Sequence, residues 1–550
     1  MTHQSVTPCA VSSPALSAPS PSAPSPSEWW RDAVIYEIYV RSFADGNGDG
    51  MGDLLGVRSR LRYLADLGVD AIWLTPFYPS PLHDGGYDVA SYRAVDPRLG
   101  TLDDARALVT EAHGLGMRVL IDIVPNHTSS EHPWFEEALR DEPGARDRYV
   151  FRPGRGPGGA EPPNDWESSF GGPAWTRVPD GSWYLHLFAP EQPDLNWDNP
   201  EVRAEFEDVM RFWLDIGVDG FRVDVAHGMV KAEGLPDAGF TGQLKMLGRA
   251  PLPFFDQDGV HEILRSWRRL LDSYPGERIG VAEVWPPSPA RLANYVRPDE
   301  LHQAFNFNYL AADWGAGPLR QVIDASIAAT DLVGAPTTWV LSNHDQVRHV
   351  TRYGGGRRGV RRARAAALLT MALPGSVYIY QGEELGLPEV LDLPDEVLQD
   401  PIFFRTAGAD RGRDGSRVPI PWAYGESSFG FSPPGADPTW LPIPRDWGGQ
   451  AVIPQLGDPR SFLNLYRNAV RLRRSHPALG RGAMRWLDSP PETLFFTREP
   501  GLLCTVNLGA EPVVLESPGT LLLASSDTRS NGLQAILEPD TAAWWSCATS

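Results

Sequence analysis

The chain has 550 residues, of which 42% are hydrophobic and 22% charged, values typical of a globular protein long enough for more than one domain. Its formal net charge of −21 opposes binding to nucleic acid or to an anionic membrane surface. Cys9, Cys504 and Cys547 are too far apart for a metal motif or a disulfide framework and favour a reducing, cytoplasmic setting, and no apolar run approaches the roughly 18 residues that span a bilayer.

Residues 1–28 are rich in Pro, Ser and Ala. This segment has neither the basic start nor the apolar run of a secretion signal, and its composition cannot supply a packed core. We therefore predict a disordered tail over 1–28 and a folded chain from Trp29 onward.

Short apolar runs alternate with helical patterns through most of the folded chain. Eight runs have the length and composition of buried strands: 33–40, 71–77, 118–126, 220–226, 278–285, 304–310, 337–345 and 376–384. Strands that alternate with helices predict a parallel sheet, and eight such units predict a closed (β/α)₈ TIM barrel, an α/β fold. The alternative is a doubly wound open sheet, which needs fewer strands and usually a Gly-rich phosphate turn that this sequence lacks.

Helix signals between the runs support this order. Thr101 followed by Asp104 forms a capping-box pattern, and Asn199 followed by Pro200 marks another helix start. Gly68 stands where the helix after the first run should end.

Two regions interrupt the barrel pattern. A connection rich in Gly, Pro and Trp, too long for an ordinary loop, separates the third run from the helix that starts near Asn199. We predict a small domain inserted after strand three, at 127–190, between two parts of the barrel at 29–126 and 191–475. Short strands separated by turn signals predict an antiparallel β domain at the C-terminus, over 476–550.

The fourth run, "GFRVDVA", places charged residues inside an apolar strand. Successive side chains of a strand face opposite sides, so Phe221, Val223 and Val225 would form an outward packing face, and Arg222 and Asp224 would share the inner face. In a (β/α)₈ barrel the active site lies at the carboxyl ends of the strands. The charged pair is therefore a candidate for function.

Three carboxylates converge at that edge of the predicted barrel: Asp224, Glu283 and Asp345. Two carboxylates that flank one bond are the minimum for glycoside hydrolysis, in which one attacks the anomeric carbon and the other, protonated, donates to the leaving oxygen. We expect Arg222 to keep Asp224 ionised as a nucleophile, and desolvation to keep Glu283 protonated as an acid.

Four segments in the order "DIVPNH" (122–127), "GFRVDVAH" (220–227), "EVW" (283–285) and "SNHD" (342–345) resemble the signature segments of the α-amylase superfamily, glycoside hydrolase family 13. The resemblance covers nearly the whole chain from Trp29. The segments "QPDLNW", "HDGGYD", "YQGEE" and "GRDGSRVPIPW" are similar to those of the oligo-1,6-glucosidase and α-glucosidase branch. In the last of them Val418 replaces Thr and Ile420 replaces Met of that branch's pattern.

The resemblance implies a role for each catalytic candidate. It implies that Asp224 is the nucleophile, that Glu283 is the acid/base, and that Asp345 stabilises the transition state by orienting sugar hydroxyls.

The resemblance also implies a subsite for the non-reducing glucose. Its lining residues would be Asp84, Tyr87, His127, Arg222, His344 and Arg413. Asp84 and Arg413 would close this end into a pocket, which implies exo action on short oligosaccharides. Phe170 is expected either to form an aromatic wall beside the scissile bond or to pack in the core of the inserted domain.

The segment "DGNGDGMGD" (45–53) spaces oxygen donors as a hard cation requires. The donors would be Asp45, Asn47, Asp49, Asp53 and the main-chain carbonyl of Met51. The segment departs from an EF-hand because Gly56 stands where a bidentate Glu is expected, and the alternative is a turn that caps the next helix. The resemblance implies a structural Ca²⁺ here that serves stability and not catalysis. Mg²⁺ is not distinguished from Ca²⁺ by the sequence, and no organic cofactor is expected.

These features predict a retaining, exo-acting α-glucosidase that releases terminal glucose from short α-glucosides, maltose and malto-oligosaccharides foremost, through a covalent glucosyl-Asp224 intermediate. The alternatives are a transglucosylase or a sucrose- or trehalose-type isomerase on the same scaffold, and an α-1,6-specific oligo-1,6-glucosidase. Val225 favours α-1,6 linkages and the "AHG" that follows it does not, so the linkage stays open, as does the oligomeric state. A non-enzymatic relative such as an amino-acid transporter heavy chain would have a membrane-spanning helix and would lack the three carboxylates.

Overall fold

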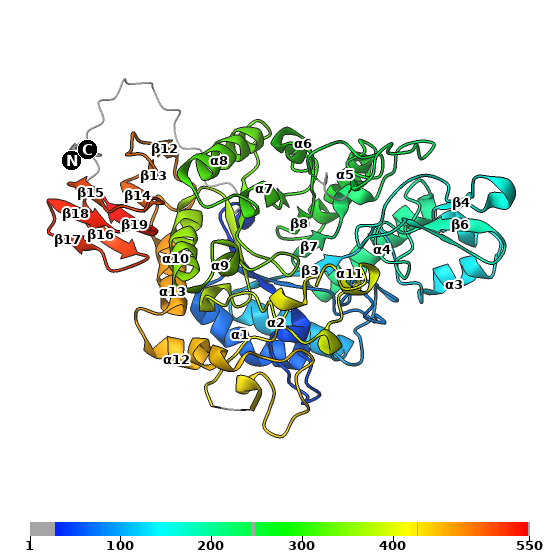
Figure 1. The fold of residues 1–550 in the computed structure, drawn as a ribbon, viewed down its shortest axis with the longest axis horizontal. Helices are drawn as coiled ribbons and strands as arrows, with labels where there is room; N and C mark the ends of the chain where they lie inside the picture. The colour runs from blue at the N-terminus through cyan, green and yellow to red at the C-terminus, as the bar shows by residue number, and fades with distance from the viewer. Residues whose placement is uncertain (1–27, 244–247, 426, 548–550) are drawn as a thin grey trace.

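Eight parallel strands form the central sheet of this structure, a computed structural model that describes residues 28–243, 248–425 and 427–547. The strand order is β10-β11-β1-β2-β3-β7-β8-β9. The strands are β1 Val34–Ile38, β2 Ala71–Leu74, β3 Arg118–Ile123, β7 Gly220–Val223, β8 Ile279–Ala282, β9 Gln303–Ala304, β10 Thr338–Val340 and β11 Ser376–Tyr380. A parallel bridge between Phe305 and Thr338 connects the two ends of the sheet, so the predicted (β/α)₈ barrel is confirmed (Figure 1). Residues 1–27 of the predicted tail lie outside the described residues.

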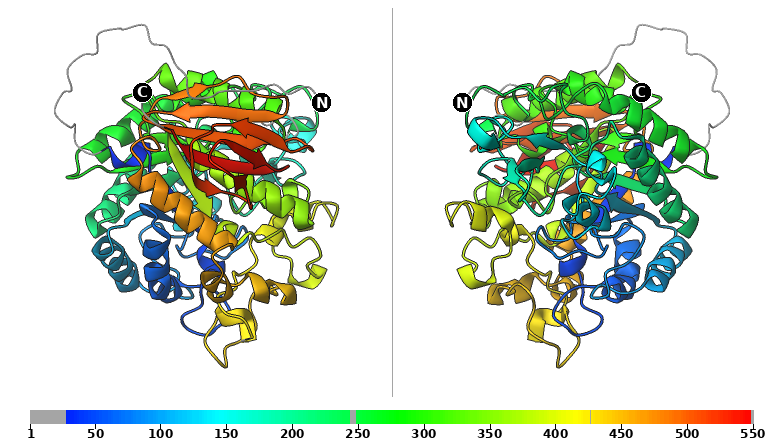
Figure 2. Two further views of the ribbon diagram at one scale, coloured as in Figure 1. Left: turned by 90° about the vertical axis from the view of Figure 1, so that its left-hand side faces the viewer. Right: turned by 90° about the vertical axis from the view of Figure 1, so that its right-hand side faces the viewer.

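Helices surround the strands (Figure 1, Figure 2). The helices of the described residues are α1 Leu54–Leu67, α2 Leu102–Gly114, α3 Pro133–Leu139, α4 Pro200–Ile216, α5 Val260–Asp272, α6 Pro289–Asn294, α7 Phe307–Leu310, α8 Ala316–Asp331, α9 His349–Arg352, α10 Gly356–Ala372, α11 Pro401–Arg405, α12 Val452–Gly457 and α13 Phe462–Ser475. Of these, α3 lies away from the barrel, in the segment inserted after β3 (Figure 1). The cap signals are confirmed: Thr101 and Asp104 form a capping box on α2, and Asn199 accepts from the first turn of α4. Gly68 ends α1 with φ 94°, a left-handed conformation that favours glycine.

The side chains of β7 alternate between an outer and an inner face, as predicted, but only up to Val223, where the strand ends. Phe221 and Val223 belong to the main apolar core, which also contains the buried side of the surrounding helices, and Arg222 is buried on the inner face with 1% of its area exposed. The expectation that Val225 packs outward is wrong. Because β7 ends at Val223, the alternation stops there, and Val225 adopts a left-handed conformation with φ 43°.

Val225 packs instead against the segment inserted after β3. Its apolar cluster contains Trp166 and Trp175 from that segment, and Phe254 and Phe255 from the loop after β7. A left-handed conformation is unfavourable for a β-branched residue, and the packing of Val225 against the insertion and the loop after β7 stabilises it.

The insertion contains a small antiparallel sheet of order β4-β6-β5, formed by β4 Phe151–Pro153, β5 Trp175–Arg177 and β6 Ser182–Leu185. The loop after β7 docks on it: Trp166 Nε1 donates to the Pro236 carbonyl at 2.8 Å, and Arg155 pairs with Asp237. This loop lies within 191–475, the range predicted for the second part of the barrel. The inserted domain predicted at 127–190 therefore does not include it, although the two pack together. In Figure 1 the sheet lies at the opposite end of the long axis from the C-terminal strands.

The predicted C-terminal β domain is confirmed as two antiparallel sheets, β12-β13-β14-β19-β16 and β15-β18-β17 (Figure 2). Their strands are β12 Met484–Trp486, β13 Thr493–Arg498, β14 Leu502–Asn507, β15 Val513–Glu516, β16 Thr520–Ala524, β17 Arg529–Ser530, β18 Gln534–Leu537 and β19 Thr541–Ser546. Trp544 of β19 donates from Nε1 to the Leu368 carbonyl of α10, which fastens the domain to the barrel. Among the described helices, none has both the length and the apolar composition needed to cross a membrane.

Candidate active site

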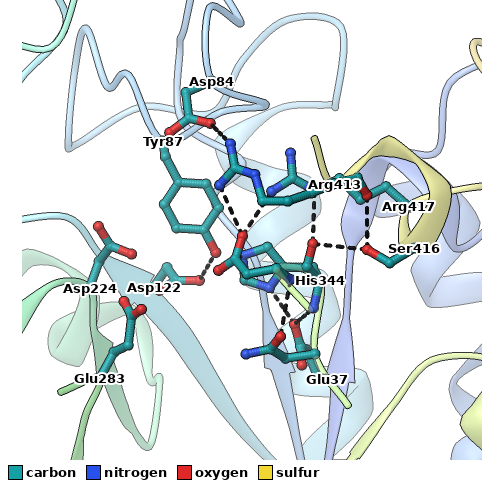
Figure 3. A network of polar contacts seen from close by, with 12 residues as sticks. Glu37, Asp84, Tyr87, Asp122, Asp224, Glu283, His344, Arg413, Ser416 and Arg417 are labelled. Atoms are coloured by element: carbon teal, nitrogen blue, oxygen red, sulfur yellow. Dashed lines mark hydrogen bonds and ion pairs between the residues drawn. The ribbon is translucent and has the colours of Figure 1, made fainter. Parts of the chain in front are cut away.

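The carboxyl ends of four barrel strands bring the three candidate catalytic carboxylates together with a fourth, Asp122. Asp122 lies on β3, Asp224 follows β7, Glu283 follows β8, and Asp345 follows β10. Figure 3 shows Asp224 and Glu283 directed toward the same space beside the ring of Tyr87. Parallel strands present their carboxyl ends at one mouth of the barrel, which explains why residues far apart in the chain meet there.

Arg222 is the centre of the charge arrangement. Its Nη1 donates to Asp122 Oδ1 at 2.7 Å and to Asp224 Oδ1 at 2.5 Å, and its Nη2 donates to Glu283 Oε2 at 2.8 Å. The guanidinium also lies over the ring of Trp73, 5.1 Å from its centroid. One cation therefore orients both of the carboxylates that the hydrolysis needs.

Sharing Arg222 among three carboxylates changes the electrostatics of Asp224. Burial raises the pKa of Asp224 well above its usual range; Arg222 opposes this, while Glu283, Asp122 and Asp345 add to it. Arg222 thus acts in the expected direction but is shared with two other carboxylates, and its holding Asp224 ionised stays a prediction. A developing positive charge at an anomeric carbon would favour the ionised form, because it places a cation beside the carboxylate.

Glu283, for which desolvation was expected, is hydrogen-bonded through one of its two carboxyl oxygens. Its Oε2 accepts from Arg222 and, at 3.0 Å, from the Val225 N–H, which the left-handed turn at Val225 directs toward it. Its Oε1 receives no hydrogen bond from the described residues. The two oxygens are thus distinct: one anchors the side chain, and the other is available to carry a proton.

Asp345 stands between two guanidiniums. Arg413 Nη1 and Arg417 Nη2 donate to its Oδ1 at 3.0 and 2.9 Å. Although burial acts the other way, the Arg413 and Arg417 guanidiniums hold the pKa of Asp345 below its usual range. This carboxylate is ionised and rigidly oriented.

Arg413 ties Asp345 to the far end of the site. Its Nη2 donates to Asp84 Oδ1 at 2.6 Å, and its Nε donates to the buried Asp400 at 2.6 Å. Asp84 also accepts from Gln192 Nε2 at 3.1 Å. Asp84 and Arg413 meet as an ion pair, as the predicted closure of one end of the site requires (Figure 3).

Tyr87 and His127 line the same end. Tyr87 donates to Asp122 Oδ2 at 3.0 Å and stacks on His344 with 5.2 Å between ring centroids. His127 lies 3.0 Å from Gln192 Nε2, and burial lowers the pKa of His127 to about 4, so the ring is neutral. Neutral imidazole, phenol and amide groups are suited to uncharged hydroxyl ligands.

Phe170 lies at the site and not only within the insertion. Arg413 is positioned over its ring, 4.9 Å from the centroid, and Phe188 meets it edge on at 5.4 Å. The residue is 4% exposed, so it is largely covered by such neighbours.

Four site residues were missed by sequence reasoning: Glu37, Gln192, Asp400 and Arg417. Gln192 and Arg417 stand inside segments already compared with glucosidases, and that position was an available signal. Glu37 stands on β1, where strand alternation puts it on one face with Tyr39, yet nothing in the sequence indicates which face is inner. Asp400 had no signal.

The segment 45–53 forms a hydrogen-bonded loop before α1. Asp45 and Asp53 are buried and each accepts three main-chain N–H bonds, while Asn47 and Asp49 are exposed and hydrogen-bond to each other. Within the described ranges, no three acidic, histidine or cysteine side chains gather as a metal-binding group. The Asn47 amide and the Met51 carbonyl would have to complete a donor set; such an all-oxygen set fits Ca²⁺.

Comparison with known proteins gives consistent matches over nearly the full length. Residues 37–482 match the family model described as "Alpha amylase, catalytic domain". The chain is 39% identical to a probable α-glucosidase of Rhizobium meliloti, over 89% of this chain and 91% of that one, and 35% identical to the oligo-1,6-glucosidase of Parageobacillus thermoglucosidasius, over 91% and 94%.

Solved structures also match over nearly the full length of the chain. An α-glucosyl transfer enzyme superposes with a TM-score of 0.86 at 38% identity, covering 94% of this chain and 99% of that one. The trehalulose synthase of Pseudomonas mesoacidophila superposes with a TM-score of 0.86 at 32% identity, covering 96% and 100%.

Proposed function

The chain belongs to the α-amylase catalytic-domain family and is a glycoside hydrolase, and we propose that it is a retaining, exo-acting α-glucosidase that releases terminal glucose from short α-glucosides, maltose and malto-oligosaccharides foremost. The observation that carries the proposal is the ion pair between Asp84 and Arg413. Arg413 of this pair also contacts Asp345, so in this proposal the pair closes that end of the site against a longer sugar chain.

In this proposal Asp224 attacks the anomeric carbon and forms a covalent glucosyl ester, while Glu283 donates a proton to the leaving oxygen. Glu283 is anchored through Oε2 and keeps Oε1 for the proton. Water then hydrolyses the ester with Glu283 as the base. Asp345, held ionised by Arg413 and Arg417, would orient hydroxyls of the terminal glucose.

The test is a comparison of hydrolysis rates on maltose, isomaltose, sucrose and trehalose, with the anomers of the released glucose followed by proton NMR. Early release of α-glucose from maltose supports the proposal. Early release of β-glucose would overturn retention, and the pattern of rates decides between α-1,4 and α-1,6 linkages.

Transfer of glucose to a second sugar is the alternative favoured by the similarity to an α-glucosyl transfer enzyme and a trehalulose synthase. Both reactions share the glucosyl intermediate and differ in whether water or a sugar accepts it. If longer oligosaccharides or isomers outweigh free glucose at low substrate concentration, the enzyme is a transferase.

The cytoplasmic location indicated by the cysteines stays a prediction.

We also propose that the 45–53 loop holds a structural Ca²⁺ through Asp45, Asn47, Asp49, Asp53 and the Met51 carbonyl. An all-oxygen donor set in a tight loop supports this. Chelation with EDTA should lower the melting temperature and added Ca²⁺ should restore it. An unchanged melting temperature after metal removal, checked by metal analysis, would overturn this proposal.

A further inference from the structure

Glu37 and His344 form a buried contact that the proposed mechanism does not use. His344 Nδ1 lies 2.6 Å from Glu37 Oε1, although the residues stand 307 positions apart in the chain. Each side chain is only 1% exposed. Figure 3 shows Glu37 on the side of His344 away from Asp84.

The other ring nitrogen of His344 faces Asp345. Nε2 lies 3.2 Å from Asp345 Oδ2, outside the angular range of a hydrogen bond, so it keeps its hydrogen-bonding capacity. The ring is held between Tyr87, at 5.2 Å, and Tyr39, at 5.8 Å between centroids. These two ring contacts oppose the rotation of the imidazole that would exchange its two nitrogens.

Geometry then selects the position of the ring proton. Burial lowers the pKa of His344 well below its usual range; Asp345 opposes this, and the neighbouring guanidiniums add to it, so the ring is neutral and carries one proton. A proton on Nδ1 would leave the unprotonated, electron-rich Nε2 3.2 Å from the ionised Asp345 Oδ2, which is repulsive. A proton on Nε2 removes that repulsion and leaves Nδ1 as an acceptor, which needs a donor at Glu37.

The surrounding charges favour an uncharged Glu37. The charged groups that face the pair are Asp122 on β3, Arg222 on β7, Asp345 after β10, and Arg413 and Arg417 after β11. These three guanidiniums already pair with Asp84, Asp122, Asp224, Glu283, Asp345 and Asp400. Burial raises the pKa of Glu37 well above its usual range; Arg222 opposes this, and Asp345 and Asp122 add to it.

We propose that Glu37 is a positioning residue whose carboxylic acid donates to His344 Nδ1 and holds the ring proton on Nε2, where it donates to a sugar hydroxyl. The proposal rests on the proposed function of this site, in that the hydroxyl belongs to a bound glucoside. With the opposite tautomer, Nε2 would present a lone pair to a hydroxyl already oriented by Asp345.

Two variants test this role by conservative rescue. Glu37→Met has a side chain of similar length and no hydrogen-bond donor. It should lower kcat/KM on maltose by about 10- to 100-fold, the loss seen at metal sites when the hydrogen-bond partner of a metal-binding histidine is removed. Glu37→Gln can donate an N–H to Nδ1 and should restore most of that loss. A Gln variant as poor as the Met variant, or a Met variant with full activity, would overturn the proposal.

Two further measurements need no substrate and so separate this proposal from the proposed function. In nitrogen NMR of the histidine rings, His344 should be protonated on Nε2 in the wild type and in Glu37→Gln. The infrared difference spectrum between these two proteins at neutral pH should show loss of a carboxylic-acid C=O band. Loss of a carboxylate band instead, or an Nδ1-protonated ring, contradicts the proposal even if glucosides are hydrolysed. Thermal unfolding verifies that each variant folds.

Discussion

Arg413 Nη2 donates to Asp84 Oδ1 at 2.6 Å and joins two segments that stand 329 positions apart in the chain. The same guanidinium contacts Asp345 and Asp400, so one side chain couples the closed end of the site to a carboxylate of the proposed reaction. Such a cation cannot be replaced by the point charge of lysine, because its separate N–H groups have different partners.

Arg413→Lys should therefore lower kcat/KM on maltose by about 100-fold or more, since breaking a buried, shared ion pair is costly. Melting temperature should fall as well, because Asp84 and Asp400 lose a partner. Arg411→Lys is the matched control: its pair with Asp395 is largely exposed and should matter little. Steady-state kinetics and thermal unfolding of both variants check this, and equal losses in the two would contradict it.

Asp224→Asn should abolish catalysis and stabilise the fold. The nucleophile is lost, so kcat/KM should fall by at least about a thousandfold. Burial and the neighbouring carboxylates raise the pKa of Asp224, so an ionised side chain there is unfavourable in the folded state, and a neutral amide of the same shape should raise the melting temperature. Asp208→Asn, on the exposed side of α4, is the control and should alter neither quantity. Retained activity in Asp224→Asn would remove Asp224 from its role.

Glu383, in the turn after β11, should make stability depend on pH. Burial, with Glu384 adding to it, raises the pKa of Glu383 to about 8, against the opposing hydrogen bond from Tyr466. In the unfolded chain the Glu383 carboxyl has its ordinary pKa of 4.5. Between these two values the folded state binds a proton that the unfolded state has lost, so the contribution to stability is fully present below the lower value and is lost as pH rises through the upper one.

Glu383→Gln keeps an acceptor for Tyr466 and cannot ionise. Its melting temperature should therefore vary less between about pH 5 and pH 8 than that of the wild type. Glu396→Gln, at an exposed position, should leave the pH dependence unchanged. Parallel curves for the wild type and Glu383→Gln would show that Glu383 is ionised in the folded protein.

Arg405, on α11, should position Phe170 through the main chain of the insertion. Both Nε, at 2.9 Å, and Nη2 donate to the Gly171 carbonyl next to Phe170. Arg405→Met should raise KM for maltose by about fivefold to tenfold with little change in kcat, because the aromatic wall predicted at Phe170 would bind substrate without touching the reacting atoms. Arg405→Lys should recover part of this, and the exposed Arg152→Met should have no effect. A drop in kcat without a change in KM would contradict the positioning role.

The sequence by itself determined the barrel and the identity of its charged strand ends. Eight apolar runs that alternate with helices are typical of a (β/α)₈ barrel. The cap signals at Thr101 and Asn199 are local patterns that need no tertiary contact. Asp224, Glu283 and Asp345 could be placed together because parallel strands necessarily meet at one edge.

Only the tertiary structure decided how the charges are shared. The number of carboxylates around Arg222 depends on contacts among β3, β7 and β8, so the protonation of Asp224 could not be read from its own strand. Val225 leaves the strand geometry and packs against the insertion and the loop after β7, contacts that its own strand pattern does not indicate. Glu37 stands on the first strand of the barrel, and its partner His344 follows the seventh. The alternation of residues along a strand indicates which side chains share a face. It does not indicate which distant residue lies next to them once the barrel closes.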